Sequence, residues 1–149
     1  MNRRPPVLVV DDEPAIRALV TKIVERAGFP TESACDGAEA ITKLEAGDFR
    51  VLVIDLNMPN VDGFALIEYI RNRGGVKPAI IVISAGDSAG FRQLDGSMVH
   101  SILRKPFDID VLGDLITAAA TAMAEQEATA DGEQGDADVL PFPDKQNVS

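Results

Sequence analysis

The stretch VLVVDDEP at Val7–Pro14 decides the fold, together with a second stretch, VLVIDLNMPNVDGF, at Val51–Phe64. Each begins with four apolar residues and then becomes acidic, at Asp11-Asp12 in the first and at Asp55 in the second. Apolar runs this short, with a helical pattern between them, predict buried parallel strands. The carboxyl ends of parallel strands meet at one crevice, where ligands bind. We therefore expect the three carboxylates to lie together at one edge of a sheet.

Polar residues at the other strand ends indicate which chemistry this edge supports. Carboxylates crowded in one crevice repel one another and lose hydration, and a hard cation with oxygen ligands, usually Mg²⁺ beside a phosphoryl group, relieves both costs. Ser84 and Lys105 follow two further predicted strands and add a hydroxyl and an ammonium group. A carboxylate nucleophile, a metal and two donors favour phosphoryl chemistry. A Ser-His-Asp hydrolase is disfavoured, because the only histidine, His100, is expected inside a strand.

The rest of the chain alternates predicted strands and helices. Further strands are expected at residues 29–34, 79–83 and 98–103, the first near an edge and the second in the centre of the sheet. Helices are expected from Pro14 to near Gly28, from Asp36 to near Gly47, between Asp62-Gly63 and Gly74-Gly75, irregularly in Gly86–Ser97, and from Asp108 through Met123. This alternation predicts an α/β fold, a three-layer α/β/α sandwich around a five-stranded parallel sheet.

Composition narrows the possible partners and location. The 149 residues fit one domain, and the net charge of −10 argues against direct binding of nucleic acid. Apolar stretches stay well below the ~18 residues of a membrane span, so we expect no membrane insertion. Cys35 is the single cysteine, which excludes an internal disulfide and favours a cytoplasmic location. We expect its thiol to be buried.

The acidic end of the chain differs in composition from the rest. Residues 125–149 hold seven acids and one base and show no apolar period, so we expect a folded domain at 1–124 and a flexible acidic tail at 125–149. Within the tail, Val139–Pro143 is a short apolar island. It either docks on a partner or on the domain itself, or has no role.

Four motifs together resemble one known family. They are VLVVDDEP and VLVIDLNMPNVDGF, quoted above, with IVISA at Ile81–Ala85 and LRKPF at Leu103–Phe107. In these motifs, and over residues 7 to about 123, the chain resembles the receiver domains of two-component response regulators. The resemblance implies the flavodoxin-like strand order 2-1-3-4-5, for which the doubly wound receiver fold is itself a standard example.

The resemblance also implies a role for each acid at the predicted edge. Asp55 would be the phosphoacceptor, taking a phosphoryl group from the phosphohistidine of a histidine kinase or of a histidine phosphotransfer protein. Asp12 would bind Mg²⁺ directly, and Asp11 would act on the metal directly or through water. Asp55 and the backbone carbonyl of Asn57 would complete the protein ligands.

Two further roles and one departure follow from the same resemblance. Lys105 would pair with the phosphoryl group, and Ser84 would hydrogen-bond it as the switch hydroxyl. Receivers usually carry an aromatic residue three positions before the lysine, where this chain has Ile102. Because an aromatic side chain is missing there and Gly86–Ser97 is rich in glycine, we expect phosphorylation to order that segment instead.

We therefore expect a single-domain response regulator rather than a turnover enzyme, since no output domain follows residue 124 in this sequence. It would signal by altered protein contacts, with its target and oligomeric state left open. One alternative is a phosphohydrolase similar to the haloacid dehalogenases, but their D-x-D pattern fails here because Asn57 stands two residues after Asp55. Another is a pseudo-receiver that serves only as an interaction module.

Overall fold

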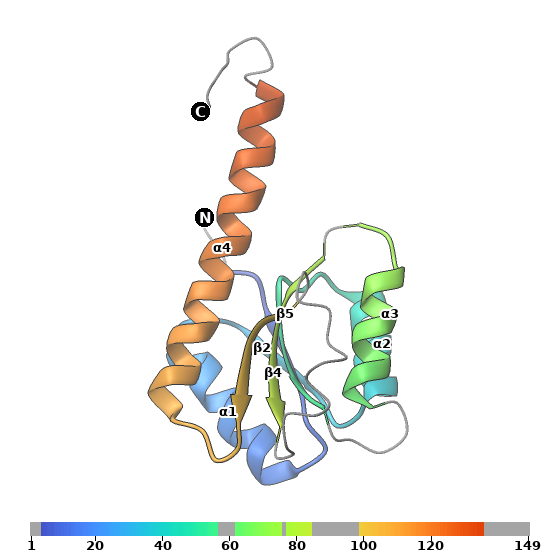
Figure 1. Cartoon of the computed structure of the whole chain (residues 1–149), viewed down its shortest axis with the longest axis vertical. Coiled ribbons are helices and arrows are strands. Elements are labelled where there is room, and N and C mark those ends of the chain that lie inside the picture. Colours follow the sequence, from blue (N-terminus) through green and yellow to red (C-terminus); the bar gives the residue numbers. More distant parts are fainter. Residues whose placement is uncertain (1–3, 57–61, 76, 85–98, 136–149) are drawn as a thin grey trace.

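A computed structural model of the chain describes residues 4–56, 62–75, 77–84 and 99–135. Helices cover both faces of a central sheet (Figure 1). The elements in chain order are β1 (Val7–Val10), α1 (Pro14–Arg26), β2 (Thr31–Ala34), α2 (Gly37–Ala46), β3 (Val51–Asp55), α3 (Gly63–Asn72), β4 (Ala79–Ser84), β5 (Val99–Arg104) and α4 (Ile109–Gly135).

The five strands in the described ranges form one parallel sheet in the order β2-β1-β3-β4-β5. This confirms the predicted order, with β2 at an edge and β4 inside the sheet. The register aligns Val10 of β1 with Ile54 of β3. Asp11 directly follows Val10 and Asp55 directly follows Ile54, so the two aspartates stand at the same level of the sheet.

Two apolar layers hold the sheet, one on each face, because side chains along a strand point alternately to opposite faces. Leu8 and Val10 of β1 belong to the cluster that includes buried residues of α2 and α3. Val7 and Val9 belong to the other cluster, formed with α1 and α4. Figure 1 shows α2 and α3 on one side of the sheet and α1 and α4 on the other. The predicted three-layer sandwich is confirmed.

The helices begin where their capping residues predict. Pro14 occupies the first turn of α1. The Asp36 carboxylate accepts a hydrogen bond from the Glu39 N–H at 2.8 Å, and Asp62 accepts one from the Ala65 N–H at 2.9 Å. Asp108, directly before α4, accepts hydrogen bonds from the N–H groups of Asp110 and Val111. Each carboxylate satisfies donors that the first helical turn leaves without a partner, which fixes these starts.

Helix α4 is longer than the predicted last helix. We expected the last helix to extend through Met123 and a flexible tail to begin at residue 125, but α4 continues to Gly135 and projects beyond the sheet (Figure 1). Ala, Glu and Gln favour helix, so a helix that is already nucleated extends readily through a stretch rich in these residues. Glu127 also pairs with Arg50, next to the start of β3. The island at Val139–Pro143 lies outside the described residues.

Two other expectations have different outcomes. The Cys35 thiol is exposed rather than buried, because Cys35 stands in the turn between β2 and α2. The irregular helix expected at Gly86–Ser97 lies outside the described residues.

Helix α3 approaches the end of β3 so closely that only glycine fits at its first position. A Cβ atom on Gly63 would lie 2.6 Å from the Cα of Leu56 and 2.7 Å from the carbonyl oxygen of Asp55. We expect Gly63→Ala to lower the free energy of unfolding by about 1–3 kcal/mol, because backbone must move to admit the methyl group. Denaturant unfolding measures this change.

Gly74→Ala is the matched control, because a Cβ atom there meets nothing within 4 Å. We expect its free energy of unfolding to stay within about 1 kcal/mol of wild type. Equal effects of the two substitutions would contradict the close approach at Gly63.

Candidate functional site

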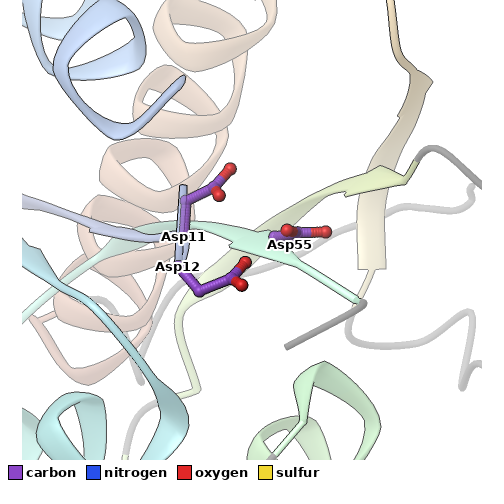
Figure 2. Close-up of side chains that lie close together, drawn as sticks. All are labelled: Asp11, Asp12 and Asp55. Atoms are coloured by element: carbon purple, nitrogen blue, oxygen red, sulfur yellow. The ribbon is translucent and has the colours of Figure 1, made fainter. Parts of the chain in front are cut away.

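The three acids singled out in the sequence come together at the carboxyl edge of the sheet. Asp11 and Asp12 follow β1 directly and Asp55 ends β3. One carboxylate oxygen from each lies within 4.8 Å of those of the other two. In Figure 2 the side chains of Asp11 and Asp12 extend from the end of β1 toward the side on which Asp55 lies. Asp11 and Asp55 are buried, and Asp12 is more accessible to solvent.

Lys105 brings a positive charge to this acid cluster. Its backbone N–H donates to the Ser84 carbonyl oxygen at 2.9 Å, which holds the residue beside the end of β4. Its Nζ lies 3.4 Å from Oδ2 of Asp55 and 3.7 Å from Oδ2 of Asp11. The same Nζ lies 3.1 Å from Oε1 of Glu13. The ammonium group therefore contacts three carboxylates, two from the loop after β1 and one from the end of β3.

The structure places Ser84 and His100 but not Asn57. Ser84 ends β4 and is 3% exposed, one position beyond the residue that pairs with Asp55. His100 lies inside β5, as expected, and not at the carboxyl end of a strand. Its side chain is exposed, and its Nδ1 lies 2.8 Å from Oγ of Ser101. Asn57 lies outside the described residues.

Backbone hydrogen bonds hold the loop that carries Asp11. The Asp11 N–H donates to the Ala34 carbonyl oxygen, and one carboxylate oxygen of Asp11, Oδ1, accepts the Glu13 N–H at 2.9 Å. Arg17 on α1 donates from its guanidinium to the Asp11 carbonyl oxygen at 2.8 Å. With Oδ1 turned to the loop, Oδ2 is the oxygen that faces Lys105.

Burial and charge shift the pKa values of two groups in the site. Loss of hydration is the main reason that the pKa of Asp11 rises to about 6, and the neighbouring charge of Asp55 adds to it against the lowering effect of the Glu13 N–H. Burial alone would lower the pKa of Lys105. The hydrogen bond to Glu13 and the charges of Asp11 and Asp55 outweigh that effect, so the pKa of Lys105 is raised.

The acid cluster fits a small divalent cation. Oxygen ligands at about 2.0–2.1 Å from one Mg²⁺ lie within about 4.2 Å of each other. The three carboxylate oxygens already lie within 4.8 Å of one another, so only small side-chain adjustments separate them from that spacing. Carboxylate oxygens are hard donors, which Mg²⁺ prefers as ligands.

Two findings bear on the wider surface. Ile102, in place of the usual aromatic residue, lies on β5 with its side chain 39% exposed. The segment Gly86–Ser97, whose ordering we expected on phosphorylation, lies outside the described residues. Among the helices that are described, none is both long and apolar enough to cross a membrane.

Sequence comparison finds the same family as the motifs. The family model for the response regulator receiver domain matches residues 7–117. The transcriptional regulatory protein TcrA of Mycobacterium tuberculosis is 30% identical over 107 residues, 71% of this chain and 42% of that protein. The sensor histidine kinase RcsC of Escherichia coli is 32% identical over 114 residues, 76% of this chain and 12% of that protein. The chain thus spans less than half the length of these curated relatives.

Structural comparison gives a matching result. The response regulator protein TrrA from Thermotoga maritima, crystallised in complex with Mg(2+)-BeF, aligns with a TM-score of 0.69 and 28% sequence identity, covering 77% of this chain and 98% of that chain. The receiver domain of the Francisella response regulator 1452 aligns with a TM-score of 0.71 and 32% identity, covering 79% and 98%.

The raised pKa of Asp11 predicts a pH dependence of stability in the metal-free protein. Because its pKa is higher in the folded state than its ordinary value of 3.8, the stability that Asp11 contributes is fully present below about pH 4 and is lost as the pH rises through about 6. Asp11→Asn removes this loss and keeps an oxygen to accept the Glu13 N–H. Relative to wild type, we expect this variant to gain about 1–3 kcal/mol between pH 4 and pH 7.

Urea unfolding of both proteins in the presence of a chelator measures the difference. A gap between variant and wild type that stays constant from pH 4 to pH 7 would contradict the assigned shift.

Proposed function

This chain belongs to the response regulator receiver domain family, and we propose that it accepts a phosphoryl group on Asp55 from the phosphohistidine of a histidine kinase or a histidine phosphotransfer protein. The observation that carries the proposal is the position of the Asp55 carboxylate. It is 3% exposed, it shares the edge of the sheet with two other acids, and its Oδ2 lies 3.4 Å from the Lys105 ammonium.

In the proposed reaction a carboxylate oxygen of Asp55 attacks phosphorus while the bond from phosphorus to the donor imidazole nitrogen breaks. The product is an acyl phosphate on Asp55, and the imidazole leaves with its electron pair. Lys105 donates to a phosphoryl oxygen and offsets the negative charge that gathers there. Ser84, at the end of the neighbouring strand, donates a hydrogen bond to the same group after transfer.

We propose that Asp11, Asp12, Asp55 and the backbone carbonyl of Asn57 hold a Mg²⁺ ion. When bound, Mg²⁺ supplies positive charge that offsets both the acid cluster and the phosphoryl oxygens. The fit of the carboxylate oxygens supports this assignment, and so does the Mg(2+)-BeF complex of the relative TrrA. The backbone bonds at Asp11 keep its outward oxygen directed to the site before any ligand arrives.

The proposed partners follow from the same chemistry. A phosphohistidine is the donor, as the family's role and the kinase RcsC among the relatives suggest, and the proposal implies the cytoplasm as location. The output is a change in the contacts that the receiver makes with a target protein, not turnover of an external substrate. Phosphorylation shifts these contacts only as far as its own interactions differ between two conformations.

Labelling with acetyl phosphate or phosphoramidate tests the proposed acceptor. We expect acid-labile phosphorylation of the wild-type protein that needs a divalent cation, and its complete loss in Asp55→Asn, because the amide cannot form the acyl phosphate. Asp48→Asn is the matched control, since Asp48 is an exposed aspartate before the opposite end of β3. Labelling of wild type that persists in a chelator, or labelling of Asp55→Asn, would refute the assignment.

A second experiment tests the proposed metal ligands without any transfer. We expect Asp12→Ala to weaken Mg²⁺ binding by about ten-fold or more, because a carboxylate donor is removed from the ion. Calorimetric titration with MgCl₂ measures the affinity. An unchanged affinity would remove Asp12 from the ligand set.

A further inference from the structure

The side chain of Glu13 makes a contact that its position at the start of α1 does not explain. It occupies the N-cap position of α1, yet its side chain makes no capping hydrogen bond. Its carboxylate instead contacts Lys105, with Oε1 at 3.1 Å from Nζ, nearer than the contacts of the same ammonium with Asp55 and Asp11. Ninety-two positions separate the two residues, so the fold creates this contact.

The two partners of this contact differ in exposure. The Lys105 side chain is 13% exposed, whereas that of Glu13 is 60% exposed. The other two acids on the ammonium, Asp11 and Asp55, are buried at the site that the proposed function gives to the metal. Of the three contacts, the one to Glu13 is therefore the one that solvent and an incoming anion reach most easily.

We propose that Glu13 is a positioning residue that acts as the resting counter-ion of Lys105. The proposal rests on the proposed function above. Glu13 draws the ammonium to the solvent side of the acid cluster, away from a position between Asp11 and Asp55 in which it would compete with Mg²⁺. A phosphoryl oxygen on Asp55 then competes with the Glu13 carboxylate for the same ammonium.

This arrangement has opposite consequences for the cation and for the phosphoryl group. Without the Glu13 charge, Lys105 settles between Asp11 and Asp55, where it competes with Mg²⁺. When a phosphoryl group or its mimic binds, Lys105 then does not have to break a contact with Glu13, so the mimic binds more tightly. Exposed ion pairs contribute about 0.2–1 kcal/mol, so each effect should amount to between about 1.4-fold and about five-fold in affinity.

A double-mutant cycle separates this contact from the simple loss of one negative charge near the site. Wild type, Glu13→Gln, Lys105→Met and the double variant are titrated first with MgCl₂ alone and then with beryllofluoride at saturating MgCl₂. Glu25→Gln, an exposed glutamate on α1, is the control for net charge.

We expect Glu13→Gln to weaken Mg²⁺ binding and tighten beryllofluoride binding, each by about three-fold. In the Lys105→Met background the same substitution should change either affinity by less than about 1.5-fold, and Glu25→Gln should change neither. Glu13→Asp keeps the charge but shortens the side chain, and we expect affinities between those of wild type and Glu13→Gln.

Two results would overturn the proposal. One is an effect of Glu13→Gln that is equally large with and without Lys105. Glu13 would then act only through its negative charge near the site and not through its contact with Lys105. The other is a variant that matches wild type in both titrations. If wild type itself fails to bind beryllofluoride in the presence of Mg²⁺, the proposed function falls together with the role of Glu13, whereas normal wild-type binding with an inert Glu13 overturns the inference alone.

Discussion

The repulsion among carboxylates held at one edge of the sheet is the constraint on which the site depends. Two like charges a few ångströms apart repel by several kcal/mol wherever water is partly excluded, and Asp11 and Asp55 are both buried. Within the part of the chain that the structure describes, Lys105 supplies the ammonium group that lies within 4 Å of three acids. One positive charge does not offset three negative ones. Burial, and to a smaller extent the charge of Asp55, raises the pKa of Asp11. An additional cation, such as the proposed Mg²⁺, would balance the charge that remains.

The fold makes this arrangement unavoidable. Parallel register places the residues after β1 and β3 at one level, and the two apolar layers fix that register from both faces. Slipping a strand by one residue would turn its apolar side chains to the wrong face, so the core resists it. Gly63 adds a local constraint, because α3 meets the backbone of Asp55 and Leu56 at a distance that leaves no room for a side chain. The stability of the core thus keeps the carboxylates close together at the carboxyl edge of the sheet, although they repel one another.

Features encoded locally were predictable from sequence. Short apolar runs ending in acids gave the strands, and aspartates three residues before a helical N–H gave the helix starts at Asp36 and Asp62. Features that depend on packing between distant parts of the chain were not predictable from sequence. The contact of Glu13 with Lys105 joins two loops remote in sequence, although an acid directly after an aspartate pair was a usable signal. The extension of α4 was missed because a projecting helix needs no apolar period, only residues with good helix propensity.

The central claim is that the buried charge at the end of β3 is a phosphoacceptor, and chemical mapping of the phosphorylated residue tests it most directly. The full chain is treated with acetyl phosphate and Mg²⁺, and borohydride then reduces any acyl phosphate to a stable alcohol that peptide mass spectrometry can locate. The account predicts homoserine at position 55 and nowhere else, formed only when both donor and Mg²⁺ are present. Homoserine at another aspartate, or a phosphorylated chain with Asp55 unchanged, would contradict it.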